Sequence, residues 1–449
     1  EWSKNKVEGC TGGGNGEVVT ARSGGELTGY LKGNTPMYIQ VEGSIGGKFA
    51  IGSNKTIIGM GAGATINGGF TIGQESNIIM RNIAITGGVD AIGVYGPHNV
   101  WIDHCDVSAC ADGLIDIKSG SDQVTVSWTR LSKHHKTMLI NSGSLKPGDA
   151  GRLHVTLHHL FFDGTKSRNP RAGVGQVHIL NCYYVGVGYG LHTYCEVEVT
   201  VEGCYFKNTN DAISQHKPGN SGSKHTSNGF NHNWDGHVKM IDNIFVNAQY
   251  KMKDETNPER IFQIDNYYMY DWIKDAAKDV PDIVGNGGAG TGSEWSKLGP
   301  LPIPGQGVVN VSRNPTLKWT KVGSQASNKV YFGKTNPPPE VETVDGYSYQ
   351  PGNLEEGTVY YWKINDGKVW KFRTSGKLAP VVPTEPVFRK NVVAPQTVSV
   401  KSPKIQKGIY NKTGFFVGVE KNENEKKQLY DLRGREHVNQ NSHQTKMKK

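Results

Sequence analysis

Five charged residues stand at fixed offsets within a repeated strand pattern, and their types could support acid–base chemistry around a bound cation. Asp112 and Asp116 lie four positions apart, and Lys136, Arg168 and Arg171 follow in later connections of the same pattern. Residues i and i+4 of a strand point to the same face, about 13 Å apart when the strand is fully extended. A bend or bulge is therefore needed if both aspartates are to reach one ion.

Asp90 precedes this pair by one period of the pattern and offers a third carboxylate. Calcium binds six to eight oxygen ligands and keeps water where protein ligands are lacking. Asp90, Asp112 and Asp116, together with water and an anionic substrate, could meet this demand, and the alternative from the residues alone is that they are solvated acids in turns. Lys136, Arg168, Arg171 and Lys166 would supply the basic side chains of the same site.

The element that must position these residues is a repeat of short alternating strands. The segments SNIIMRNIAIT, HNVWIDHCDVS, DQVTVSWTRLS, LHVTLHHLFFD, QVHILNCYYVG and VEVTVEGCYFK share one register. Their matching positions are separated by 22, 24, 31, 22 and 22 residues and are Asn82, His104, Trp128, His159, Asn181 and Gly203. Such self-similarity indicates a solenoid, and alternation inside each copy indicates strands. The sequence therefore predicts a parallel β-helix whose longer gaps are loops on the binding face.

The residue after each matching position forms a second column that includes Cys182 and Cys204. Stacked coils would bring these two residues about 4.8 Å apart. They could form a ladder of buried thiols, with two small side chains filling a turn, or a disulfide.

Composition narrows the class of protein. The chain has 449 residues and 58 glycines, and its apolar residues are mostly Val and Ile in short runs, which favours an all-β fold with more than one domain. The net charge of +9 arises from residues 376–449, which hold 15 Lys and Arg against 6 Asp and Glu. The body of the chain is therefore balanced, and we expect no nucleic-acid partner. No apolar run approaches the roughly 20 residues of a membrane helix, and no basic-then-apolar start precedes the domain, so we expect a secreted protein whose signal peptide lies outside this sequence.

The motifs WIDH, DGLIDIKSGSDQVTVSW, KTMLI, RNPR and VHILNCYY resemble those of the pectate lyases of polysaccharide lyase family one. The resemblance covers roughly residues 10–290. It implies a right-handed parallel β-helix, a calcium cofactor, and β-elimination on polygalacturonate or pectin by a monomeric secreted enzyme.

The resemblance also assigns roles to single residues. Asp90, Asp112 and Asp116 fall on the family's calcium ligands, Arg168 on its proton-abstracting arginine, and Lys136 on a lysine that binds a substrate carboxylate. The sequence departs from the family at two positions, Gly88 and Gly173, where some members carry a further acid and a further base. Arg171 or Lys166 is the candidate replacement for the missing base.

An arginine can act as a base only under special conditions, because guanidinium groups ordinarily stay protonated below about pH 12. Neighbouring cations disfavour the protonated form, and a cation on the substrate carboxylate makes the substrate proton more acidic. These effects predict an alkaline optimum. Lys136 is the alternative base, since a lysine shifts its pKa more readily.

The C-terminal third changes pattern. We expect the β-helix over residues 1–293, a Gly- and Pro-rich linker over 294–307, and a small β-sandwich similar to fibronectin type III modules over 308–375. The sandwich is expected to be a spacer, with a carbohydrate-binding module as the alternative. Residues 376–449 form a basic tail, partly disordered or a sorting segment.

Three other functions fit parts of this pattern. A pectin lyase acting on methylated polymer would need no calcium, and the three aspartates argue against it. A β-helical hydrolase would need a pair of acids flanking the scissile bond. A non-catalytic pectin-binding β-helix is allowed by the fold, because β-helices host many functions, and only the ordered set of Asp, Lys and Arg residues opposes it.

Overall fold

The structure is a computed structural model, and it describes most of the chain up to residue 376. The described residues are 10–13, 16–61, 64–141, 149, 151–215, 225–227, 230–232, 236–250, 261–262, 270, 273–292, 302–304, 311–319, 327–367 and 369–376, with four short strands beyond residue 400. Two compact units divide the chain, residues 1–381 and residues 382–449.

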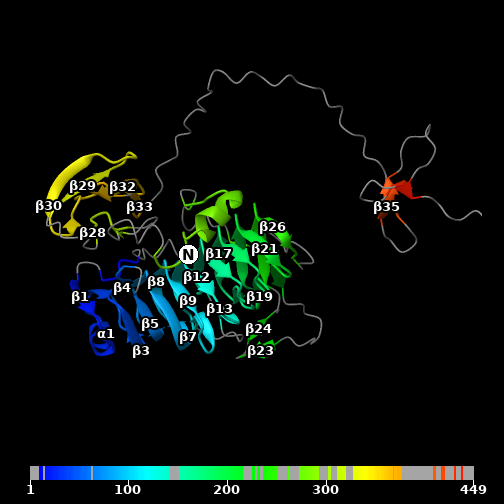
Figure 1. The fold of residues 1–449 in the computed structure, drawn as a ribbon, viewed down its shortest axis with the longest axis horizontal. Coiled ribbons are helices and arrows are strands. Elements are labelled where there is room, and N and C mark those ends of the chain that lie inside the picture. Colours follow the sequence, from blue (N-terminus) through cyan, green and yellow to red (C-terminus); the bar gives the residue numbers. More distant parts are fainter. Residues whose placement is uncertain are drawn as a thin grey trace, which may run out of the picture. The chain divides into compact units, whose positions relative to one another are not determined.

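The first unit contains a parallel β-solenoid whose strands stack coil upon coil from β1 to β26 (Figure 1). One wall, here called sheet A, has ten parallel strands. In order they are β1 (Glu17–Ala21), β2 (Met37–Val41), β4 (Lys55–Gly59), β6 (Ile78–Arg81), β8 (His98–Asp103), β11 (Asp122–Ser127), β14 (His154–His158), β17 (Gln176–Leu180), β20 (Glu198–Glu202) and β25 (His237–Ile241). The predicted all-β fold with a parallel β-helix is confirmed.

The second sheet, sheet B, divides into two limbs at the long strand β7 (Ala84–Tyr95), which follows β3 (Ser44–Ile51) and β5 (Thr65–Ile72). Residues 84–86 of β7 pair with β9, whereas residues 92–95 pair with β10. The first limb contains β10 (Gly113–Lys118), β13 (Lys136–Ile140), β16 (Arg171–Gly173), β19 (Leu191–Tyr194) and β22 (Ile213–Gln215). The second contains β9 (Asp106–Ser108), β12 (Arg130–Ser132), β15 (Phe161–Asp163), β18 (Tyr183–Val185), β21 (Tyr205–Thr209) and β26 (Ile244–Ala248). Each complete coil thus contributes one strand to sheet A and one to each limb.

The six matching positions of the sequence repeat all occupy the left-handed backbone region, with φ of 53° at Asn82, 48° at His104, 47° at Trp128, 54° at His159, 49° at Asn181 and 59° at Gly203. Asn and Gly tolerate this conformation better than most residues. The asparagines also bridge coils, since Asn181 Nδ2 donates to Gly203 O at 2.9 Å. The rings of His104, Trp128 and His159 stack on one another at this corner, with centroids 5.7 and 4.1 Å apart. The repeat in the sequence is therefore the turn that closes each coil.

The interior is filled by inward-facing aliphatic residues and by a column of stacked rings. Phe162, Tyr184, Phe206 and Phe245 follow one another with centroids 4.6, 4.3 and 5.0 Å apart. Cys182 and Cys204 lie in the neighbouring column as free thiols, with Cys182 N donating to Cys204 Sγ at 3.3 Å. Of the two alternatives for this pair, the structure shows the ladder of thiols, and all six cysteines are free.

Helix α1 (Gly24–Leu31) precedes the second coil and begins with a capping box. Ser23 accepts a hydrogen bond from Glu26 N, and Glu26 accepts one from Arg22 N at 2.8 Å. Leu27 and Leu31 are fully buried in the solenoid core, so the helix contributes apolar surface at the N-terminal coils.

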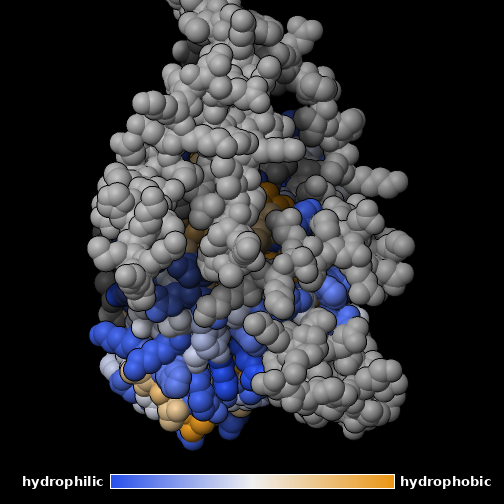
Figure 2. Space-filling view, turned by 90° about the vertical axis from the view of Figure 1, so that its right-hand side faces the viewer, coloured by the Kyte–Doolittle hydropathy of each residue, from blue (hydrophilic) through white to orange (hydrophobic). Residues whose placement is uncertain are grey.

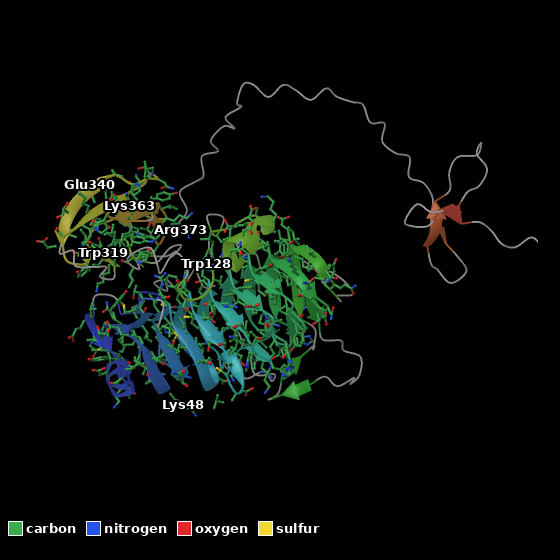
Figure 3. All side chains as sticks on the ribbon, viewed as in Figure 1. Lys48, Trp128, Trp319, Glu340, Lys363 and Arg373 are labelled. Atoms are coloured by element: carbon green, nitrogen blue, oxygen red, sulfur yellow. The ribbon has the colours of Figure 1, made fainter. Side chains whose placement is uncertain are left out.

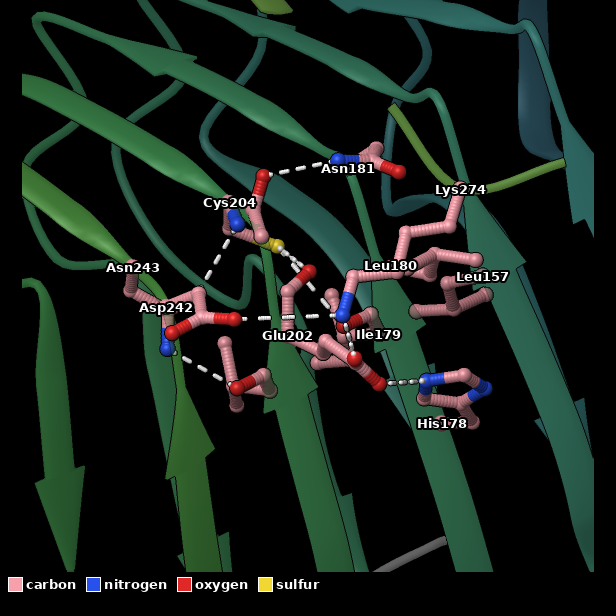
Figure 4. Close-up of polar contacts among 12 residues, drawn as sticks. Leu157, His178, Ile179, Leu180, Asn181, Glu202, Cys204, Asp242, Asn243 and Lys274 are labelled. Carbon is pink, nitrogen blue, oxygen red and sulfur yellow. Dashed lines mark hydrogen bonds and ion pairs between the residues drawn. The ribbon is translucent and has the colours of Figure 1, made fainter. Parts of the chain in front are cut away.

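A buried ionic network lies on the outer face of sheet A (Figure 4). Glu202 is 2% exposed and pairs with Lys274, and His178 Nε2 lies 3.5 Å from its other oxygen. Burial alone would raise the pKa of the Glu202 carboxyl, but His178, Lys274 and Tyr270 outweigh burial and hold this pKa at about 2. The folded pKa lies below the ordinary value of 4.5, so Glu202 stabilises the fold above that pH and loses this contribution as the pH falls toward 2.

Glu202→Gln should therefore reduce the free energy of unfolding at neutral pH and weaken its dependence on pH in the acid range. The measurement is urea unfolding of both proteins from acid to neutral pH, with Glu355→Gln as the control because the Glu355 side chain is 65% exposed. An acid limb as steep in Glu202→Gln as in the wild type would contradict the assignment.

A small β-sandwich follows the solenoid, as predicted. One antiparallel sheet contains β27 (Pro302–Ile303), β28 (Leu317–Trp319) and β31 (Ser348–Tyr349), and the other contains β30 (Glu340–Asp345), β29 (Ser327–Gly333), β32 (Val359–Ile364) and β33 (Trp370–Arg373). Its core includes Trp319, Trp362 and Phe372, and Figure 3 shows Trp319, Glu340, Lys363 and Arg373 on this sandwich. β27 lies within the predicted linker, so part of that segment is a strand of the sandwich.

The second unit retains four short strands, β34 (Gly408–Tyr410), β35 (Phe416–Val419), β36 (Leu429–Tyr430) and β37 (Glu436–His437), which pair as two hairpins. The rest of the predicted basic tail lies outside the described residues. Within the described part of the chain, no helix has both the length and the apolar character of a membrane span. The described surface in Figure 2 is mostly hydrophilic, with small separate hydrophobic patches.

Candidate active site

The outward face of the first limb of sheet B carries Asp116 and Arg171, and the other predicted site residues lie on β7 or at and before the first residues of the limb's strands. Its strands are in parallel register, so residues at equivalent positions form a column that runs from coil to coil. Asp116 is two strands away from Arg171 in this column, a separation of about 10 Å. The column consists of Gly93, Asp116, Leu139, Arg171, His192 and Ser214.

Asp90 and Asp116 converge above Gly113 at the start of β10. Gly113 N donates to Asp90 Oδ1 at 2.8 Å. A Cβ atom at position 113 would lie 2.5 Å from Asp116 Oδ1 and 3.1 Å from Asp90 Oδ1. The absence of a side chain at this position therefore lets the two carboxylates lie directly over the backbone of Gly113.

Asp116 Oδ1 is buried and has no hydrogen-bond partner within the described part of the chain, and the residue is 4% exposed. Its other oxygen, Oδ2, accepts from Lys118 Nζ at 2.7 Å. Burial raises the pKa of the Asp116 carboxyl, and Lys118 opposes this shift. An unpaired buried carboxylate oxygen is costly unless a cation satisfies it.

Asp112 lies in the turn before β10 and pairs with Lys136 rather than with the other two aspartates. Lys136 Nζ donates to Asp112 Oδ1 at 2.7 Å, and this hydrogen bond lowers the pKa of Asp112. His134 Nε2 lies 2.5 Å from Asp112 O and tethers the same turn. Among the described residues no three His, Cys, Asp or Glu side chains lie close enough together to hold a metal. The structure thus brings together two of the three predicted calcium ligands.

Arg168 lies in a segment that backbone hydrogen bonds attach to the preceding and following coils. Met138 N donates to Arg168 O at 2.7 Å, and Asn169 N donates to Gly190 O at 3.2 Å. Arg168 itself has φ of 61°. After the larger effects of Lys136 on Asp112 and of burial on Asp116, the positive charge of Arg168 makes a small contribution that lowers the pKa of both carboxyl groups.

The two departures from the family pattern have a structural reason. A Cβ atom at Gly88 would lie 2.4 Å from Gly68 O, and one at Gly173 would lie 2.5 Å from the ring of Tyr194. The Arg171 guanidinium lies over that ring, 4.5 Å from its centroid. Lys166 is exposed, and its backbone N donates to His134 O at 3.1 Å.

Three polar residues of this site were missed from the sequence. Tyr95 donates to Asp90 Oδ2 at 2.8 Å, Lys118 lies 5.0 Å from the Tyr95 ring centroid, and His134 holds the Asp112 turn. Lys118 follows Asp116 by two positions on one strand, so alternation alone places both on the same face. That signal was present in the sequence.

The arrangement combines an acidic recess with a basic border. Asp90 and Asp116 can supply hard oxygen ligands to a cation. Such a cation would give the buried Asp116 Oδ1 the partner that it otherwise lacks. Lys136, Arg168 and Arg171 can bind anionic groups, and arginine does so through two parallel hydrogen bonds. Such a site suits a substrate that carries several carboxylates.

Known proteins show the same combination of sequence and fold. The sequence model of a family described as pectate lyase matches residues 5–288. A probable pectate lyase B of Aspergillus flavus is 38% identical over 219 residues, which are 45% of this chain and 67% of the relative. A pectate trisaccharide-lyase of Thermotoga maritima is 34% identical over 195 residues, which are 39% of this chain and 53% of the relative.

Solved structures agree at the level of the fold. Pectate lyase II of Xanthomonas campestris aligns with a TM-score of 0.53 at 22% identity, over 64% of this chain and 99% of that one. A pectate lyase of Bacillus sp. N165 solved in complex with trigalacturonate aligns with a TM-score of 0.51 at 23% identity, over 64% of this chain and 96% of that one. At these identities the likeness concerns the architecture of the solenoid.

Proposed function

This chain belongs to the pectate lyase family, and from that premise we propose that it is a secreted, calcium-dependent enzyme that cleaves α-1,4-polygalacturonate by β-elimination. The product would carry a double bond between C4 and C5 of the new non-reducing end. We also propose that the enzyme acts as a monomer, with the pectic polymer as its partner.

The observation that carries the calcium proposal is the unsatisfied, buried Asp116 Oδ1 beside Asp90 over the backbone of Gly113. Two carboxylates that lie together over a residue without a side chain, one of them with an unsatisfied oxygen, fit a hard cation with oxygen ligands. Asp90 and Asp116 would hold the ion. Asp112 would become a third ligand if its carboxylate left Lys136 and turned to the ion. Calcium, when bound, would coordinate the carboxylate of the uronate and stabilise the negative charge that develops at C5 of the same sugar.

The protein's own residues perform the remaining steps. Lys136 binds a substrate carboxylate, and its position one strand from Gly113 places it beside the acidic recess. Arg168, as the neutral guanidine, takes the C5 proton, and the backbone hydrogen bonds that hold its segment to the coils on either side support this role. The electron pair of the broken C5–H bond then forms the double bond between C4 and C5 as the bond between C4 and the glycosidic oxygen breaks. That oxygen leaves with the departing chain and takes a proton from water.

We further propose that the sandwich is a fibronectin type III module. Its sheets of three and four antiparallel strands agree with the seven-stranded sandwich of such modules. The expected role is a spacer, and the boundaries proposed for the parts are residues 1–293, 294–307, 308–375 and 376–449.

Gly113→Ala tests the cation site without removing a charged group. The added methyl would lie 2.5 Å from Asp116 Oδ1, so we expect calcium affinity to fall by about 10–100-fold, as when groups that orient metal ligands are changed. Calcium titration by calorimetry measures this change. Gly73→Ala is the matched control, because a Cβ there meets nothing within 4 Å. Equal calcium affinity in the two variants would contradict this placement of the ion.

A further inference from the structure

The ring of Tyr194 occupies the space that a side chain at position 173 would need. Positions 173 and 194 are partners in the register of β16 and β19. A Cβ atom at Gly173 would lie 2.5, 2.6 and 2.8 Å from three ring carbons of Tyr194. Gly173 does not adopt a left-handed φ, so space and not backbone conformation excludes a side chain. A side chain at 173 and this ring are mutually exclusive.

Tyr194 is rigidly held. The residue is fully buried, and its hydroxyl donates to Asn141 O at 3.0 Å, directly after β13. The side chain therefore reaches from β19 across β16 to the end of β13 and ties three coils together. A ring fixed in this way can serve as a platform for a neighbouring group.

Arg171 packs against the ring of Tyr194. Its guanidinium carbon lies 4.5 Å from the Tyr194 ring centroid, a cation–π contact that also restricts the long side chain. Lys118 and Lys136 each pair with an aspartate, whereas Arg171 has no ion pair with a carboxylate within the part of the chain that the structure describes. The guanidinium is therefore held in place and ready to bind an anion.

We propose that Tyr194 is a positioning residue that orients Arg171 as a carboxylate clamp, and that this pair makes the enzyme select a non-esterified uronate at one subsite. The inference rests on the proposed function. Arg171 lies about 10 Å from Asp116 along the column, so it would contact a sugar away from the reacting one. A planar guanidinium binds a carboxylate through two charge-assisted hydrogen bonds, and a methyl ester offers neither the charge nor both acceptors.

The test compares kcat/KM on polygalacturonate with kcat/KM on partly methyl-esterified pectin, using Arg171→Ala, Arg171→Lys, Tyr194→Leu and Tyr194→Phe. For Arg171→Ala we expect kcat/KM on polygalacturonate to fall about 10–100-fold, chiefly through KM, because hydrogen bonds to charged groups are lost. For Tyr194→Leu we expect kcat/KM to fall about 10-fold, whereas Tyr194→Phe keeps the ring but loses the hydrogen bond to Asn141 O, so its kcat/KM should lie between those of the wild type and Tyr194→Leu. Preference for the non-esterified polymer should decrease in both Arg171→Ala and Tyr194→Leu.

A double-mutant cycle separates positioning from simple destabilisation. If Tyr194 acts through Arg171, Tyr194→Leu should have little further effect in the Arg171→Ala background. Additive effects, or equal losses on both polymers, would overturn the proposal. Arg171→Lys leaves the buried ring intact, so it tests the clamp even if Tyr194→Leu does not fold, and an unchanged substrate preference in this variant would also contradict it.

Failure of the proposed function can be told apart from failure of this inference. If the wild type forms no unsaturated product, the lyase proposal fails. Binding of trigalacturonate by calorimetry then still tests the clamp, since Arg171→Ala should bind it about 10-fold more weakly than the wild type. Equal binding by the two proteins would overturn the clamp itself.

Discussion

Arg168→Ala is expected to lower kcat on polygalacturonate by about 10²–10⁴-fold, the usual contribution of a general base. Proton abstraction is proposed for the neutral guanidine of Arg168, whose segment is hydrogen-bonded to the coils on either side. KM should change little, because Lys136 and Arg171 remain to bind the substrate. Steady-state kinetics at alkaline pH, followed by the absorbance of the unsaturated product, measures both constants.

Arg152→Ala is the matched control, since Arg152 is an exposed arginine of the same solenoid. Its activity should equal that of the wild type. If Arg168→Ala kept more than about a tenth of the wild-type kcat, Arg168 would not be the base. Lys136→Ala would then be the decisive variant, because Lys136 is the other basic group beside the acidic recess.

Asp116→Asn is expected to abolish activity at ordinary calcium concentrations and to weaken calcium binding by roughly 100-fold or more, because calcium affinity depends on the number of charged ligands. The substitution keeps the shape of the side chain and removes the charge that lies over the backbone of Gly113. Excess calcium should restore part of kcat, since the remaining machinery is unchanged. Calorimetry and activity measured over a range of calcium concentrations test both statements.

Asp242→Asn provides the control for this variant. Asp242 has a side chain that is 76% exposed and a φ of 50°, which asparagine tolerates. Its calcium response should match that of the wild type. A calcium response of Asp116→Asn that is indistinguishable from that of Asp242→Asn would remove Asp116 from the cation site.

The repeat could be predicted from the sequence because it reflects backbone conformation. The turn that closes a coil needs a left-handed residue, and this need recurs once per coil, so Asn82, Asn181 and Gly203 mark it in the sequence. Alternation then defines which residues face inward. The parallel β-helix and the outward face of Asp116 follow from these two periodicities.

Side-chain partners could not be predicted in the same way. The spacing of Asp112 and Asp116 predicts a shared face only if both belong to one strand, but β10 begins at Gly113 and leaves Asp112 in the preceding turn. From that turn Asp112 reaches Lys136 on the next coil, a contact between residues 24 positions apart in sequence. Rotamers and packing between coils decide such pairs, and a single sequence does not encode them in its spacing.

The contact between Gly173 and the ring of Tyr194 is a further feature that could not be predicted from the sequence. The two residues are 21 positions apart, and only the register between β16 and β19 makes them neighbours. An aligned repeat extended to these short strands would have paired them. Their mutual exclusion depends on the direction of the ring, which Asn141 fixes through the tyrosine hydroxyl.

The most direct test of the central claim is the ultraviolet absorbance of polygalacturonate incubated with the enzyme at alkaline pH, with calcium and with excess chelator, for the wild type and for Arg168→Ala. We predict a rise that requires calcium and that Arg168→Ala nearly abolishes. A rise that persists in chelator would contradict the calcium site and favour a pectin lyase. Reducing ends without a rise would show a hydrolase, and no change of either kind would show a binding scaffold.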